Sequence, residues 1–162
     1  MREDSVYYYT KRWFTDAGFR ILAGQPPNGT DRFPVIEVKS GTNNERGSRN
    51  VFKPDLIAAT QLSIVLVECK PRFSQEDVDK LRSIRDDQQR RTALVEELRQ
   101  RRVLESNDLG SSYREALAID QALRFAIAFE GSRVDLSDIY SLVLESNGDG
   151  SLYLGDDIIS SL

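Results

Sequence analysis

Two short motifs with chemically useful side chains lie at the ends of two apolar runs. Asp55 opens the first run, over residues 56–59, and Glu68 and Lys70 close the second, over residues 64–67. Apolar runs of this length, bounded by polar residues, are typical of buried strands. Charged side chains are seldom buried unless they are paired. These three charged residues are therefore candidates for a functional site.

The spacing of the two runs predicts a β-hairpin, which decides how the charged residues face one another. A tight turn or a four-residue loop between the runs places Asp55 directly opposite Glu68. Directly opposed residues share a sheet face, with Cβ atoms about 4.5–5.5 Å apart. Two carboxylates so placed repel each other unless one is protonated or a cation lies between them. Because side chains alternate along a strand, Lys70 should share this face, whereas Cys69 should point away and offer only its backbone carbonyl.

This set of groups suits a hard divalent cation. Mg²⁺ commonly binds one or two carboxylates together with water and substrate phosphate, and we expect Mn²⁺ to substitute for it. We predict a metal site formed by Asp55, Glu68 and the Cys69 carbonyl, with Lys70 beside it. Alone, the tripeptide Glu-x-Lys, which also occurs at residues 37–39, is an ordinary strand end, and Pro-Asp is an ordinary turn signal. The prediction depends on both motifs at hairpin spacing.

Pro54-Asp55 followed by Glu68-Cys69-Lys70 resembles the signature of the PD-(D/E)XK nucleases, which include many restriction endonucleases and the archaeal Holliday-junction resolvases. The likeness covers roughly residues 3–72. It implies an α/β fold with a restriction-endonuclease-like core, in which helices flank a mixed central sheet. It also implies a Mg²⁺-dependent endonuclease that hydrolyses phosphodiester bonds in DNA, with Asp55, Glu68 and Lys70 as catalytic residues.

The resemblance has two departures. Family members often carry a metal-binding Glu in the first helix, but here Tyr7 stands at that place and the nearest acid is Glu3. The candidates for a further metal ligand are therefore Glu3, Glu37 and water. In addition, residues 33–40 form an extra strand-like run that the compact resolvases lack.

Basic residues near the motifs suggest contacts with nucleic acid. The polar loop over residues 41–53 leads directly into the first motif, and its Arg and Asn side chains are types that contact phosphates and base edges. We predict DNA-binding roles for Arg46, Arg49, Lys53 and Arg72. RNA is the weaker alternative as substrate. Since one small centre cuts one strand, we expect a homodimer or a subunit of a larger nuclease assembly. The alternative function is a non-catalytic nuclease-fold module that binds DNA or a partner protein.

Composition narrows the possible chemistry. The chain of 162 residues suits one domain over residues 1–162. It contains no histidine, which excludes Ser-His-Asp and Cys-His catalysis and zinc sites of ordinary composition. A single cysteine, an N-terminus without a secretory signal and no apolar run long enough to span a membrane predict a cytoplasmic protein with no membrane association. The net charge of −4 argues against indiscriminate binding of nucleic acid.

Hydrophobic periodicity predicts the remaining elements. A helix over residues 3–17 carries an apolar stripe, and another begins at Ser74 and either protrudes, bends near Asp86-Asp87 or pairs with a second subunit. Its four arginines alternate with acids, which favours a salt-bridged surface over DNA contacts. A third helix over residues 112–123 opens with a capping box from Ser112 to Glu115. Further strands are predicted over 19–23, 33–39, 125–129, 139–145 and 151–154, followed by a tail. The first apolar stripe consists of Val6, Tyr9, Trp13 and Ala17, and the four arginines are Arg82, Arg85, Arg90 and Arg91.

Overall fold

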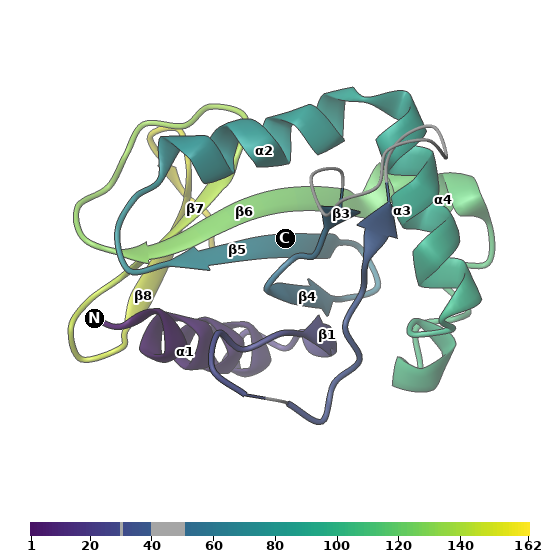
Figure 1. Ribbon diagram of the computed structural model, residues 1–162, viewed down its shortest axis with the longest axis horizontal. Helices are drawn as coiled ribbons and strands as arrows, with labels where there is room; N and C mark the ends of the chain where they lie inside the picture. Colours follow the sequence, from purple (N-terminus) through teal and green to yellow (C-terminus); the bar gives the residue numbers. More distant parts are fainter. Residues whose placement is uncertain (30, 40–50) are drawn as a thin grey trace.

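The computed structural model describes residues 1–29, 31–39 and 51–162. In these residues the chain is an α/β protein with four α-helices, a seven-stranded mixed sheet and a small two-stranded hairpin (Figure 1). The helices are α1 (Glu3–Asp16), α2 (Gln75–Asp86), α3 (Gln88–Gln100) and α4 (Ala116–Ala122), with a 3₁₀ turn η2 (Glu105–Asn107). The large sheet contains β1 (Arg20–Gly24), β4 (Leu56–Ala59), β5 (Ile64–Lys70), β6 (Leu123–Glu130), β7 (Tyr140–Leu144), β8 (Gly150–Leu154) and β9 (Asp157–Ile158). The small hairpin pairs β2 (Val38–Lys39) with β3 (Val51–Phe52).

The order of strands in the large sheet is β1-β4-β5-β6-β7-β8-β9. The pairs β5–β6 and β6–β7 are parallel, and the other neighbours are antiparallel. Parallel neighbours need a long crossover, and the chain between β5 and β6 supplies α2, α3 and α4. The predicted mixed sheet with flanking helices is therefore confirmed at the level of an α/β fold.

Helices cover both faces of the sheet (Figure 1). Helix α1 packs on one face, where Val65 and Val67 of β5 meet its apolar side chains. Helices α2, α3 and α4 pack on the other face, which Ile64 and Leu66 of β5 share. The alternate residues of β5 thus enter two separate cores. This arrangement explains why the strand is apolar throughout until Glu68.

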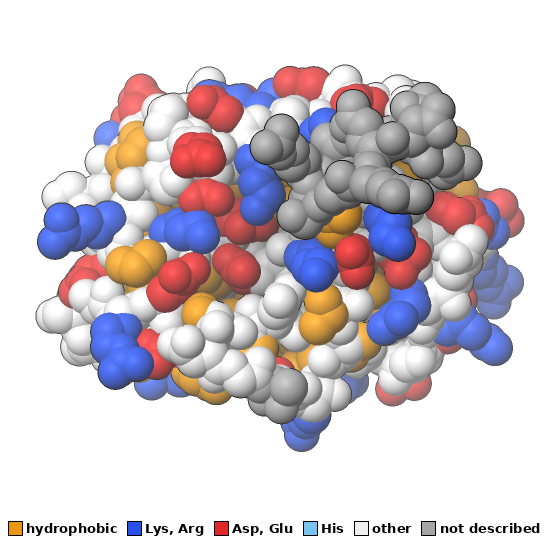
Figure 2. Space-filling view, in the orientation of Figure 1, with side chains coloured by type: hydrophobic (Ala, Val, Ile, Leu, Met, Phe, Trp, Pro, Cys, Tyr) orange, Lys and Arg blue, Asp and Glu red, His pale blue; other side chains and the backbone are white. Residues whose placement is uncertain are grey.

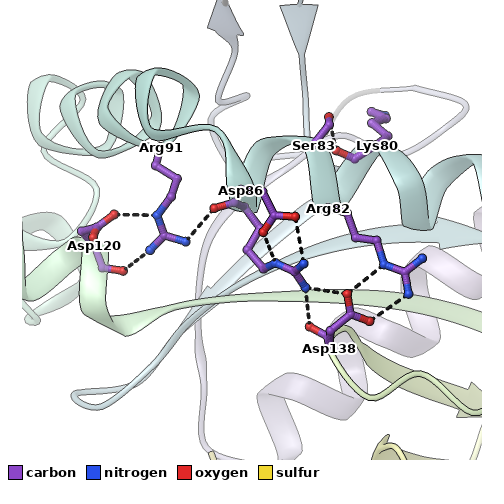
Figure 3. Close-up of polar contacts among 8 residues, drawn as sticks. Lys80, Arg82, Ser83, Asp86, Arg91, Asp120 and Asp138 are labelled. Atoms are coloured by element: carbon purple, nitrogen blue, oxygen red, sulfur yellow. Dashed lines mark hydrogen bonds and ion pairs between the residues drawn. The ribbon is translucent and has the colours of Figure 1, made fainter.

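Of the three alternatives for the long helix, the bend near Asp86-Asp87 is present, because α2 ends at Asp86 and α3 begins at Gln88. Ser74 caps α2 by accepting a hydrogen bond from the backbone of Asp77 (3.2 Å), and Asp87 caps α3 in the same way. Asp87 has an extended backbone conformation, so the chain turns between the two helices. The arginines of these helices are paired with acids, as predicted (Figure 3). Asp138, before β7, accepts hydrogen bonds from Arg82 and Arg85.

Several predicted boundaries were wrong. Of the strand predicted over residues 33–39, only Val38–Lys39 is a strand, since Pro34 has no N–H for a ladder. The predicted capping box does not form, because α4 begins only at Ala116. Tyr113, within the predicted box, is buried, and its hydroxyl donates a hydrogen bond to the Thr60 carbonyl at 2.6 Å. The predicted tail contains β9 (Asp157–Ile158). In α1 the buried stripe is Val6, Tyr7, Thr10 and Phe14, rotated from the stripe predicted.

No helix in the described parts of the chain is long and apolar enough to cross a lipid bilayer.

Candidate metal and catalytic site

The β4–β5 hairpin has the predicted register. Leu56, the first residue of β4, pairs with Val67, so the same register places Asp55 opposite Glu68. The two carboxylates are close enough for the charge of Asp55 to raise the pKa of Glu68. Cys69 points to the α1 face, as predicted, where its thiol is fully buried. The backbone therefore brings the two carboxylates together and turns the thiol away from them.

Pro54 interrupts the hydrogen-bond ladder of the hairpin and changes the partners of the Cys69 backbone groups in β5. In this register, Pro54 and Cys69 would form the next hydrogen-bonded pair of the antiparallel ladder. The Cys69 N–H instead donates to Asp55 Oδ2 at 2.7 Å, which orients the aspartate toward β5. Proline has no N–H, so Pro54 cannot donate to the Cys69 carbonyl. Within the described residues, the Cys69 carbonyl therefore faces the Pro54 side of the ladder with no N–H there to donate to it, and it could serve as a ligand.

Glu68 is a buried carboxylate whose negative charge is only partly offset by neighbouring groups. It is 2% exposed. The Lys80 ammonium lies 3.3 Å from Glu68 Oε1, yet within the described residues no donor meets hydrogen-bond geometry at that oxygen. Burial and the neighbouring Asp55 raise the pKa of Glu68 to about 8, while Lys80 opposes them. Burial likewise raises the pKa of Asp55. The pair is therefore poorly stabilised as two anions and would gain from a cation.

Lys70 lies at the end of β5, between two helices. Its ammonium is 3.3 Å from Glu3 Oε1 of α1 and 4.0 Å from Asp77 Oδ2 of α2. Burial acts to lower the pKa of Lys70, but the surrounding carboxylates, Asp77 first among them, outweigh burial and raise it. Lys70 is therefore held as an ammonium at the same end of the hairpin as Asp55. In Figure 1, the start of α1, the end of β5 and the start of α2 come together at this end.

The structure separates the two candidates for a further metal ligand. Glu3 contacts Lys70, and its charge also acts on Asp55, so it lies at the edge of the site. Glu37 lines a different pocket, of about 500 Å³, between β2 and α3. Tyr7, at the place of the family's helical acid, is fully buried, and its hydroxyl contacts Asp31 Oδ2 at 3.1 Å. Burial, followed by Asp31, raises its pKa far above the usual range, so Tyr7 stays a neutral phenol.

The predicted DNA-binding residues can be placed only in part. Lys53 and Arg72 are exposed, one just before Asp55 and the other just after β5. Arg46 and Arg49 lie outside the residues that the structure describes. Figure 2 shows acidic and basic side chains intermixed on the face between α1 and α2.

Two residues of the site were not predicted from the sequence. Asp77 and Lys80 lie one turn apart on α2, and they reach Lys70 and Glu68 respectively. The capping pattern at Ser74 correctly marks Asp77 as lying in the first turn of α2. The apolar stripe of α2 shows which side of the helix is buried. Which part of the sheet that side packs against can be deduced only when the path of the chain from β5 to β6 is known.

The side chains present fit one hard cation with few protein ligands. In the described ranges, no three His, Cys, Asp or Glu side chains cluster as a ready-made metal site. What remains is two carboxylates and a backbone carbonyl, and water and phosphate would have to supply the other ligands of a usual Mg²⁺ set. Among the residues that the structure describes, none hydrogen-bonds the buried Glu68 Oε1, and this is the observation that favours such a cation.

No protein-family model, curated protein or solved structure matches the chain.

Proposed function

We propose that the protein is a metal-dependent nuclease of the PD-(D/E)XK type, with a restriction-endonuclease-like core, that hydrolyses phosphodiester bonds in DNA. The observation that carries the proposal is the pairing of Asp55 with buried Glu68 at the end of a hairpin, with the Lys70 ammonium at the same end. The absence of histidine supports it, because the remaining inventory of carboxylates, lysine and tyrosine suits hydrolysis assisted by a hard metal.

Each residue has a distinct role in this proposal. Asp55, Glu68 and the Cys69 carbonyl would hold Mg²⁺, which polarises the phosphate and makes bound water a stronger nucleophile. Lys70 donates hydrogen bonds to the attacking water and to a phosphate oxygen, and its positive charge offsets the charge that develops in the transition state. Glu3 and Asp77 position the Lys70 ammonium.

Cleavage of DNA tests this function directly. Purified protein is incubated with supercoiled plasmid and 10 mM Mg²⁺ or Mn²⁺, and nicked and linear products are measured over time. We expect cleavage by the wild-type protein that is lost with EDTA, in Asp55→Asn and in Lys70→Met. Glu96→Gln, an exposed acid on α3, is the control and should cleave as the wild type does.

Equal cleavage by the wild type, Asp55→Asn and Lys70→Met would contradict the proposed site. Binding of DNA by the wild type without any cleavage would favour the non-catalytic alternative. The same assay with a single-stranded RNA oligonucleotide decides between the two polymers.

A further inference from the structure

Lys80 reaches the candidate site from α2. Its ammonium is 3.3 Å from Glu68 Oε1 and 5.1 Å from the centre of the Phe52 ring. The Lys80 side chain is 41% exposed, whereas that of Glu68 is 3% exposed. Lys80 therefore stands between a buried carboxylate and solvent.

The contact between Lys80 and Glu68 differs from the structural ion pairs of the same helix. Arg82 and Arg85 donate hydrogen bonds of 2.7–2.8 Å to Asp138, and these fix the helix to the loop before β7. In Figure 3 the Lys80 side chain projects away from this network. Its own contact lacks hydrogen-bond geometry at the glutamate oxygen, in the part of the chain that the structure describes. Charge and packing hold Lys80 in place, and a flexible side chain held in this way can turn to another anion.

We propose that Lys80 is a second lysine of the site, and that its ammonium binds the phosphate backbone of bound DNA. The inference rests on the proposed function, because Lys80 is released when the charge of Glu68 is offset by another cation. The DNA phosphate that is cleaved must bind beside Glu68. It is therefore the nearest anion to which the released Lys80 ammonium can turn. Lysine suits this role as a compact, mobile point charge.

Three facts favour phosphate over a purely structural role for Lys80. Four acids, Asp55, Glu68, Glu3 and Asp77, act on one another and on the two lysines of the site. With Lys70 as the one lysine that binds phosphate, this excess of negative charge would repel a polyanion such as DNA. The ammonium is exposed enough to contact solvent. The ammonium lies over the Phe52 ring, and this contact positions the amine without consuming its hydrogen bonds.

The salt dependence of DNA binding tests this role. A fluorescent 20-base-pair duplex is titrated in Mg²⁺ from 50 to 200 mM KCl with the Lys70→Met protein, which keeps Asp55 and Glu68 and should not cleave, and then with the same protein carrying Lys80→Met, Lys80→Arg or Arg99→Met. One lost phosphate contact lowers the slope of log K against log[salt] by about 0.9 and weakens binding on the order of five- to tenfold at 0.1 M salt. We expect this loss for Lys80→Met, and the parental slope for Lys80→Arg. Arg99→Met, which removes one exposed charge from α3, should also keep the parental slope.

Each outcome has a separate meaning. An unchanged slope in Lys80→Met overturns the proposal, even if that variant is less stable toward urea, because a structural ion pair alters stability and not the number of phosphate contacts. Absence of DNA binding by the parent protein also overturns it. If the wild type binds DNA but does not cut it, the proposed nuclease function fails, while the slope still decides whether Lys80 contacts phosphate.

Discussion

Replacing Glu68 by glutamine should make the protein more stable at neutral and alkaline pH. Burial and Asp55 raise the pKa of Glu68 from 4.5 to about 8 in the folded protein. Between these values the folded state binds a proton that the unfolded state has released, so the free energy of unfolding falls as pH rises through this window. The glutamine variant carries no such proton and should lack this part of the pH dependence.

The shift in pKa sets the size of the effect. One pKa unit corresponds to about 1.36 kcal/mol, so Glu68 lowers the free energy of unfolding by roughly 3 kcal/mol at pH 7, where the folded state must still bind its proton, and by roughly 4–5 kcal/mol above pH 8, where the buried carboxyl ionises. Near pH 4.5 the two proteins should be about equally stable. Such a difference is a large fraction of the 5–15 kcal/mol that is typical of whole domains.

Urea denaturation in EDTA, followed by the fluorescence of the single tryptophan, measures this difference. Trp13 donates a hydrogen bond to the Gly150 carbonyl at 3.0 Å, so its emission should report loss of packing between α1 and β8. Wild type, Glu68→Gln and the exposed control Glu96→Gln are compared at unit steps from pH 5 to 9. Parallel curves for wild type and Glu68→Gln over this range would refute the reasoning, because they would show that Glu68 is not held at a raised pKa.

Repeating the urea denaturation with Mg²⁺ in place of EDTA gives a second test. A cation beside Glu68 favours its ionised form, so Mg²⁺ should stabilise the wild type more at pH 8 than at pH 6. At ten times the dissociation constant the gain is about 1.4 kcal/mol. Glu68→Gln should show much less of it. Equal stabilisation of both proteins would indicate that the ion binds elsewhere.

Two further predictions follow from contacts outside the carboxylate pair. Asp138→Asn weakens the pairing with Arg82 and Arg85 and should lower the free energy of unfolding by about 1–2 kcal/mol at pH 7. Because these arginines depress the pKa of Asp138, the loss should become smaller as pH falls below about 4 toward that depressed pKa, and urea melts at pH 3 and 7 can check the difference. Pro54→Ala adds a backbone N–H that can donate to the Cys69 carbonyl. This competing hydrogen bond of about 0.5–1.5 kcal/mol should weaken Mg²⁺ binding roughly two- to tenfold, as measured by calorimetry. An unchanged affinity would show that the carbonyl is not a ligand.

The hairpin at the centre of the site could be predicted because its determinants are local. Two apolar runs with a short connection leave little choice of register, and a shift by one residue would turn every side chain to the wrong face. The opposition of Asp55 and Glu68 follows from that register, and so does the position of Cys69 on the opposite face of the sheet. The start of α2 was also predictable, because Ser74 caps the helix through its own side chain.

The parts of the site that were not predicted depend on tertiary packing. Asp77 and Lys80 reach the hairpin only because α2 crosses back over the sheet toward β6, and no local pattern encodes that direction. Two-residue strands such as β3 and β9 carry too little periodicity to be recognised. The buried side of α1 was predicted with the wrong rotation, because Tyr7 combines a buried ring with a hydroxyl that contacts Asp31.

Anomalous diffraction from a crystal grown with Mn²⁺ tests the central claim most directly. The account predicts a manganese peak in contact with oxygens of Asp55 and Glu68 and with the Cys69 carbonyl, with Lys70 nearby, and it predicts loss of that peak in Asp55→Asn. A crystal with full access to Mn²⁺ that shows no peak between these carboxylates, or shows an unchanged peak in Asp55→Asn, would contradict it.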